Sequence, residues 1–248
     1  MTKKRWFRRV FIALAAVIVP CCAGFGVYVS DYHHASDTAA AALSAGERKG
    51  ASVAISEGDD VIAVGDESAD YGLVFYPGGK VDPVAYVPLA QKLAERGMFC
   101  VIVKMPFNLA VFNIKAADTV ISAYPRVSHW WVGGHSLGGA AAAMYAADNA
   151  DKLEGVALLG AYASDDLSAL GLKVEVVYGS NDGVVNREKL QACIDMVPSS
   201  DVLKIKGGNH AGFGDYGAQD GDGKASISNE DQQEQTAEAI AAAMTGAV

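Results

Sequence analysis

The chain has 248 residues, of which 51% are hydrophobic and 20% charged, enough for one domain with a large core but not for a second catalytic domain. The first thirty residues carry five cations and no acid, so the net charge of −9 leaves −14 on the remainder. An acidic body argues against nucleic acid as a partner, because phosphate backbones are bound through Lys and Arg.

An uncharged segment follows the five cations. It runs from Val10 to Val29, and twenty residues rising about 1.5 Å each make a helix as long as a hydrocarbon core is thick. The cations on its N-terminal flank predict a cytoplasmic N-terminus and a globular body outside the cell membrane. We therefore predict that residues 1–30 are a cytoplasmic tip and a single-pass transmembrane helix, with the membrane as a partner.

Other interpretations of this segment stay open. A cleaved signal peptide would place its best small-residue cleavage site near Ala35 and would make the protein secreted. The twin arginines at positions 8 and 9 resemble an export signal that leaves the direction of transport unchanged. A lipoprotein site at Cys21 or Cys22 fits poorly behind Pro20, and a core helix fits poorly beside five cations.

Residues 31–50 are rich in Ala, Ser and charged residues and are predicted to form a linker, with His33 and His34 solvated. From residue 51 to residue 248, short apolar runs alternate with longer helical patterns, which predicts one α/β domain with a mostly parallel sheet flanked by helices. The first two strands should form a hairpin, because their connection is too short for a parallel crossover. Strands are predicted at 52–56, 60–65, 72–76, 98–103, 129–133, 155–159, 173–178 and 201–205, and helices at 84–96, 116–123, 139–149, 187–196 and 231–244.

A candidate nucleophile lies between the fifth strand and a helix of small residues. Residues 134–138 read GHSLG, with Ser136 at the centre. A sharp strand-to-helix turn needs glycine two residues to either side, since a Cβ there would meet the following helix. The turn would aim the serine Oγ outward at a helix N-terminus, where free N–H groups favour developing negative charge. We predict Ser136 to be a nucleophile rather than a helix cap.

A nucleophilic serine needs a general base, usually histidine. His210 follows the last predicted strand, at the edge of the sheet where Ser136 is expected. His129 begins a strand and so lies at the opposite edge. His135 is next to the nucleophile on a tight turn, where neighbouring side chains point apart. His210 is therefore the predicted base.

The acid that orients the base should follow an intermediate strand at the same edge. Asp182 does so, in a turn rich in glycine after the strand at 173–178, and Asp165 and Asp166 are the alternatives. The chain order of serine, acid and histidine is the order found in α/β-hydrolases.

Backbone donors for an oxyanion are predicted in two places. The PGG sequence after the strand at 72–76 offers the N–H of Gly79, and the residue after the nucleophile offers the N–H of Leu137. No cofactor or metal site is predicted. The long loop at 206–228 is rich in Gly and Asp, and we expect a solvated acidic loop beside His210.

Several motifs together make residues 51–248 similar to the α/β-hydrolase superfamily, in its dienelactone-hydrolase-like branch and a small membrane-anchored bacterial subgroup. These are GHSLG, FYPGGKVDP at 75–83, MPFNLA at 105–110 and NHAGFGDYG at 209–217. True dienelactone hydrolases use a cysteine where this chain has Ser136. The resemblance implies an α/β-hydrolase fold with an eight-stranded sheet and a triad of Ser136, Asp182 and His210.

The segment from Ala161 to Leu172 is short at the place where lipases commonly insert a lid, so no cap domain is predicted. An open site suits small esters, and we expect a carboxylic-ester hydrolase acting on a small-molecule ester. An amidase, peptidase or acyltransferase with the same triad is an alternative, as is a non-catalytic membrane-anchored interaction module.

Overall fold

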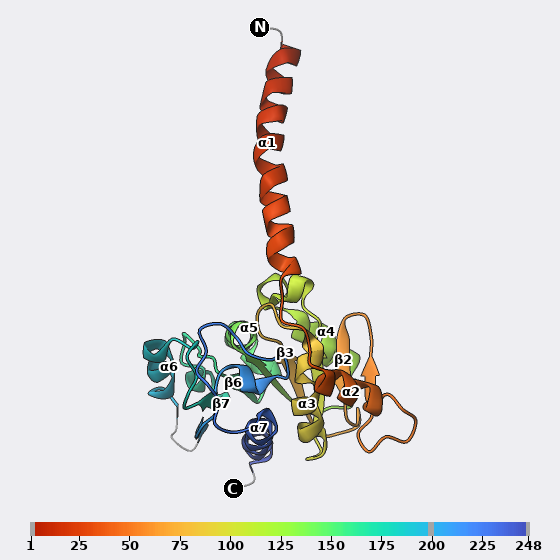
Figure 1. Cartoon of the computed structure of the whole chain (residues 1–248). Helices are drawn as coiled ribbons and strands as arrows, with labels where there is room; N and C mark the ends of the chain where they lie inside the picture. The colour runs from red at the N-terminus through yellow and green to blue at the C-terminus, as the bar shows by residue number, and fades with distance from the viewer. Residues whose placement is uncertain (1–2, 198–200, 247–248) are drawn as a thin grey trace. The chain divides into compact units, whose positions relative to one another are not determined.

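The computed structural model describes residues 3–197 and 201–246 and divides into two units, residues 1–32 and residues 33–248. The first unit contains one long helix, α1 (Lys3–Ser30), and the second contains all the strands and the remaining helices (Figure 1).

The predicted transmembrane helix is not supported by α1. Within residues 3–197 and 201–246, no helix combines the length and the apolar character needed to cross a membrane.

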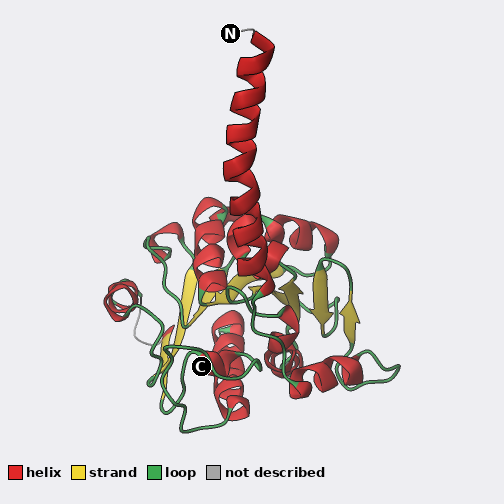
Figure 2. Ribbon diagram, turned by 45° about the horizontal axis from the view of Figure 1, so that its top comes forward, coloured by secondary structure: helices red, strands yellow, loops and turns green. Residues whose placement is uncertain are grey.

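Eight strands form one sheet in the second unit (Figure 2). Their order is β1-β2-β4-β3-β5-β6-β7-β8. Strand β1 pairs antiparallel with β2 and β2 pairs antiparallel with β4, whereas all the other pairs are parallel. The mostly parallel eight-stranded sheet and its first hairpin are thus confirmed. The strands are β1 (Ile55–Glu57), β2 (Val61–Val64), β3 (Tyr71–Tyr76), β4 (Phe99–Val103), β5 (His129–His135), β6 (Gly155–Leu159), β7 (Lys173–Gly179) and β8 (Val202–Ile205).

Helices cover both faces of the sheet, and the apolar core is divided accordingly into two clusters. Helices α4, α5 and α6 contribute to one cluster, and α2, α3 and α7 contribute to the other. The α-helices are α2 (Asp37–Gly46), α3 (Val87–Ala94), α4 (Ala116–Ala123), α5 (Leu137–Asp148), α6 (Arg187–Ile194) and α7 (Asn229–Thr245). Short 3-10 helices are η1 (Pro83–Tyr86), η2 (Pro106–Asn108), η3 (Ala110–Phe112), η4 (Ala150–Lys152), η5 (Ser168–Leu170) and η7 (Ala211–Phe213).

Central strands are buried on both faces, which explains their unbroken apolar sequences. Every residue of β4 and of β6 is buried. Alternate residues of each strand contribute to opposite clusters: Val101 faces α4 and α5, whereas Cys100 and Ile102 face α3.

The predicted linker at 31–50 is wrong for most of its length. Ser36 caps helix α2, its side chain accepting a hydrogen bond from the N–H of Ala39, and Ala39 is fully buried. His33 pairs with Val81 as an isolated bridge, and its N–H donates to the carbonyl of Lys80 over 2.7 Å. The alanine-rich pattern that suggested a linker is therefore the apolar face of a short capped helix within the folded unit.

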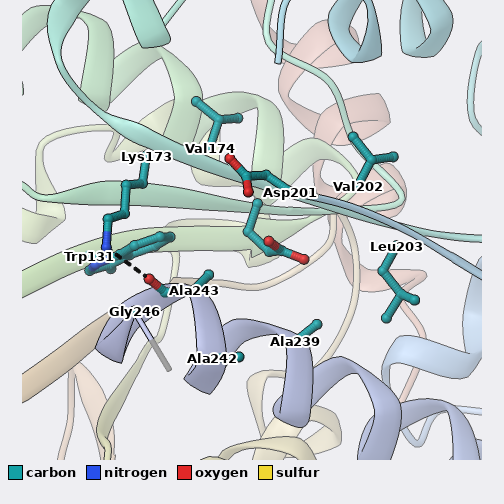
Figure 3. A pocket seen from close by; sticks show the side chains of 11 residues that line it. Trp131, Lys173, Val174, Asp201, Val202, Leu203, Ala239, Ala242, Ala243 and Gly246 are labelled. Atoms are coloured by element: carbon teal, nitrogen blue, oxygen red, sulfur yellow. Dashed lines mark hydrogen bonds between the residues drawn. The ribbon is translucent and has the colours of Figure 1, made fainter. Parts of the chain in front are cut away.

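One acidic side chain is buried inside the sheet. Glu175 on β7 is 5% exposed and borders a pocket of about 530 Å³ between the sheet and α7 (Figure 3). Trp131, Lys173 and Asp201 surround this pocket, and the Lys173 ammonium donates to the carbonyl of Ala243. Burial, and then the charge of Asp201, raise the pKa of Glu175 to about 8, so the folded protein holds this side chain protonated at neutral pH.

Replacing this acid should change how stability depends on pH. Because the pKa of Glu175 rises from 4.5 to about 8 on folding, the free energy of unfolding should fall as pH rises between these values and level off above them. Glu175→Gln should therefore leave stability at pH 5 nearly unchanged and raise it by about 2–4 kcal/mol at pH 9. Urea unfolding of both proteins at the two pH values measures this difference, and an equal effect at both would contradict it.

Candidate active site

Ser136 occupies the turn between β5 and α5 and has an unusual backbone conformation. Its φ of 53° and ψ of −121° lie in a region that side chains other than glycine rarely adopt. The turn is held from both sides, because the Ser136 N–H donates to the carbonyl of Leu159 and the Ser136 carbonyl accepts from Ala140. These bonds to β6 and α5 offset the cost of the strained turn.

The two glycines of the GHSLG sequence have no room for a side chain. A Cβ on Gly138 would lie 2.1 Å from the carbonyl oxygen of Tyr76 and 2.2 Å from that of Pro77. A Cβ on Gly134 would lie 2.6 Å from the backbone of Gly138 and 2.5 Å from the Tyr76 oxygen. The predicted steric role is therefore correct, and the crowding comes from the end of β3 as well as from the helix.

His210 and Asp182 form a buried hydrogen-bonded pair. The His210 Nδ1 lies 2.8 Å from the Asp182 Oδ2, and each residue is 1% exposed. The Asp182 Oδ1 accepts from the N–H groups of Val184 and Val185, each over 2.9 Å. Asp182 follows β7 and His210 follows β8, so the sequence placed the two residues at the correct edge of the sheet.

The pair is arranged to keep Asp182 ionised. Burial by itself raises the pKa of this carboxyl, but the hydrogen bond from His210, its charge and the two backbone donors outweigh burial, and the net pKa lies below the usual value. An ionised Asp182 holds the proton of His210 on Nδ1. The other ring nitrogen, Nε2, is buried and has no hydrogen-bond partner within the described residues.

Ser136 approaches this pair through the end of β6. The Ser136 N–H bonds to Leu159, and the next residue, Gly160, lies directly against the pair. A Cβ on Gly160 would lie 2.9 Å from the His210 Nδ1 and 3.1 Å from the Asp182 Oδ2. Gly160 also has a φ of +51°, so both its conformation and its contacts favour glycine. The three predicted residues thus follow β5, β7 and β8, and the end of β6 lies between the first of these strands and the other two.

The predicted oxyanion donors lie next to each other. A Cβ on Gly79 would lie 2.8 Å from the Cδ2 of Leu137, which places the end of the β3 loop beside the first turn of α5. The preceding N–H, that of Gly78, donates to the Tyr86 hydroxyl over 3.0 Å and is not free for a ligand. The next N–H of this loop, that of Gly79, stays the predicted donor.

His135 lies next to His210. The sequence analysis excluded His135 as a base and did not predict this contact. Its ring lies 4.5 Å from the ring of His210, measured between centroids, and its Nδ1 lies 2.8 Å from the Tyr86 hydroxyl. Burial, followed by the proximity of His210, lowers the pKa of His135 well below its ordinary value. Since the Tyr86 hydroxyl accepts from Gly78, its proton is available to the neutral His135 ring.

The remaining candidates lie elsewhere. His129 begins β5 and pairs with Glu154 at the surface, in agreement with the sequence argument. Asp166 accepts hydrogen bonds from the backbone and side chain of Ser168 in its own exposed turn, and Asp165 is also exposed. The pocket beside Glu175 lies near the starts of β7 and β8, at the sheet edge opposite Ser136.

Comparison with known proteins identifies the family. Residues 72–234 match the model of the alpha/beta hydrolase family. The chain belongs to this family. Membership supports a hydrolase activity of a general kind, and no curated protein matches the sequence.

Several solved structures resemble this hydrolase in fold. Est1E from Butyrivibrio proteoclasticus is 15% identical, with a TM-score of 0.55 over 78% of this chain and 99% of the other. A monoacylglycerol lipase from Paleococcus ferrophilus is 14% identical, with a TM-score of 0.53 over 69% and 94%. A bacterial membrane phospholipase A is 13% identical, with a TM-score of 0.57 over 98% of each chain. Identities this low establish a common fold only.

The acid of this hydrolase can be tested by a matched pair of substitutions. Asp182→Asn should lower kcat by about 10³-fold, because a neutral amide no longer holds the His210 proton on Nδ1. Asp166→Asn should leave kcat unchanged, because the hydrogen bonds that Asp166 accepts from described residues come from its own turn, at Ser168 and Ala169. Steady-state kinetics of both variants measures this, and activity lost in the Asp166 variant alone would reassign the acid.

Proposed function

We propose that this protein is a serine hydrolase that cleaves small carboxylic esters, with Ser136 as nucleophile, His210 as general base and Asp182 as the orienting acid. The observation that carries the proposal is the buried Asp182–His210 hydrogen bond, which leaves the His210 Nε2 without a partner among the described residues. A general base needs a ring nitrogen that is free to take a proton, and the hydrogen bond to Asp182 leaves Nε2 of His210 free for this purpose.

The proposed reaction uses each group once per half-cycle. The Ser136 Oγ attacks the ester carbonyl carbon while the His210 Nε2 takes the hydroxyl proton. The carbonyl oxygen becomes an oxyanion and accepts hydrogen bonds from the N–H groups of Gly79 and Leu137. When the bond to the alcohol oxygen breaks, His210 returns the proton to the leaving alcohol.

Water completes the cycle. It attacks the acyl-enzyme carbonyl as His210 accepts one of its protons, and the acid leaves as Ser136 regains that proton. Asp182 stays ionised throughout and stabilises the imidazolium. The net reaction consumes one ester and one water and releases one acid and one alcohol.

A small substrate is favoured by the short connection between β6 and β7. Only residues 160–172 join these strands, and the helix among them is the single turn η5. No cap helices from this connection cover the site, so nothing in it forms a long acyl tunnel. The dienelactone-hydrolase-like branch stays a proposal drawn from sequence motifs, with a serine in place of that branch's cysteine.

Activity-based labelling tests the nucleophile. A fluorophosphonate probe should label the wild type, and Ser136→Ala should abolish labelling and lower kcat for p-nitrophenyl acetate by about 10⁴-fold or more. Esters of two to four acyl carbons should be turned over faster than esters of twelve. Folded wild-type protein that takes up no label would instead support a non-catalytic interaction module.

The same preparation separates ester from amide hydrolysis. A short p-nitroanilide matched to the best p-nitrophenyl ester should be cleaved much more slowly than the ester. Faster cleavage of the anilide would replace the proposal with an amidase or peptidase. Transfer of the acyl group to an added alcohol in preference to water would replace it with an acyltransferase.

We propose separately that residues 1–30 direct the catalytic domain across the cell membrane and hold it there, single-pass, with the N-terminus in the cytoplasm. The support is the uncharged run from Val10 to Val29 behind five cations. The full chain should sediment with membranes and resist carbonate extraction, and a chain starting at Ala35 should not. Full chain released by carbonate would contradict the anchor, and a shorter mature chain would show cleavage.

A further inference from the structure

The acidic loop at 206–228 is joined to the active site through one of its carboxylates. The Asp222 Oδ1 accepts from the N–H of Gly183 over 3.0 Å and from the N–H of His210 over 3.2 Å. The Asp222 Oδ2 accepts from the N–H of Ala211 over 2.9 Å. Its Oδ1 also accepts from the N–H of its neighbour Gly223. Asp222 is thus a four-fold acceptor rather than a solvated surface acid.

These donors belong to the two turns that present the acid and the base. Gly183 directly follows Asp182 in the turn after β7, and His210 with Ala211 lies in the turn after β8. Apart from its bond to Gly223, the Asp222 carboxylate therefore joins the backbone on either side of the Asp182–His210 hydrogen bond. An ionised carboxylate suits this place, because it accepts several N–H bonds at once and each is strengthened by its charge.

The segment around Asp222 is closely packed against the same two turns. A Cβ on Gly223 would lie 1.9 Å from the carbonyl oxygen of Asn181. The Asn181 amide donates to the carbonyl of Lys224, and the Asn209 amide donates to that of Gly223. The side chains of Asn181 and Asn209, which precede Asp182 and His210, therefore hold the segment around Asp222 in place. The Asp222 carboxylate in turn accepts from Gly183 and Ala211, which follow them.

We propose that Asp222 is a positioning residue of the active site, which keeps the Asp182 carboxylate and the His210 ring at hydrogen-bond distance during turnover. The proposal rests on the proposed function, since it gives Asp222 a role through Asp182 and His210. Without its two oxygens, the turns after β7 and β8 lose their shared acceptor, and the base loses its fixed orientation toward Ser136.

A matched pair of variants tests this role. Asp222→Asn keeps the size of the side chain but replaces one acceptor oxygen with a donor, and it should lower kcat by about 10–100-fold with KM changed less than about threefold. Asp220→Asn removes the same charge from the same loop. Asp220 is exposed and its side chain makes no hydrogen bond among the described residues, so this control should keep wild-type kcat.

A longer acid provides a rescue. Asp222→Glu restores the charge and both oxygens, and it should recover part of the kcat that Asp222→Asn loses. Circular dichroism and thermal unfolding verify that each variant is folded before its kinetics are compared. A folded Asp222→Asn protein with wild-type kcat would overturn the proposal, as would an equal loss in the Asp220 control.

A spectroscopic measurement separates this proposal from the proposed function. The proton shared between the His210 Nδ1 and Asp182 should give a far-downfield proton resonance, assigned by its loss in His210→Gln. It should shift or broaden in Asp222→Asn and stay unchanged in Asp220→Asn. An unchanged resonance in Asp222→Asn overturns the positioning role, whereas absence of Ser136-dependent labelling in the wild type overturns the proposed function.

Discussion

The hydrogen bond between Asp182 and His210 is the interaction on which the arrangement of the site depends. Both partners are almost fully buried, and a buried carboxylate without hydrogen bonds would be strongly destabilising. Here the carboxylate accepts from His210 and from two backbone N–H groups, which lower its pKa despite burial. Both turns that present the pair must therefore be fixed at the ends of β7 and β8.

The site also requires that the backbone at the ends of β3, β5 and β6 pack closely around Ser136. The end of β6 connects the Ser136 turn with the Asp182–His210 pair, because Leu159 accepts from the Ser136 N–H and Gly160 lies against the pair. The glycines at 134, 138 and 160 permit this, since a side chain at any of them would meet a carbonyl oxygen, backbone atoms or the pair itself. The cost is a strained conformation at Ser136, which neighbouring hydrogen bonds sustain.

Local patterns predicted most of the fold. The strands at 129–133 and 155–159 and the helix at 116–123 carry strong apolar or periodic signals, and the structure has elements at these positions. Ser136, Asp182 and His210 could be chosen because each follows a predicted strand at one edge of a parallel sheet, and the structure brings the latter two into contact. Helix α2 was missed because its alanine-rich sequence resembles a linker when the surface it packs on is unknown.

Contacts between distant segments gave no such signal. The Tyr86 hydroxyl meets His135 across 49 positions of sequence, and Asp222 meets Gly183 across 39. No motif around Tyr86 or Asp222 predicts its partner, because hydrogen bonds of this kind depend on where loops meet after the sheet has formed. Asp222 was judged a solvated acid from the composition of its loop, which describes the average residue there and not the one that faces inward.

The two neighbouring histidines show why burial matters to the chemistry. The ring centroids lie 4.5 Å apart, so a positive charge on both rings at once would be unfavourable. Burial, and then the proximity of His210, lowers the pKa of His135 well below its ordinary value. His135 therefore stays neutral, and its Nδ1 can accept a hydrogen bond from the Tyr86 hydroxyl while that hydroxyl accepts one from the Gly78 N–H. Because Gly78 precedes the predicted oxyanion donor Gly79, neutral His135 connects this loop, through Tyr86, with the ring of His210.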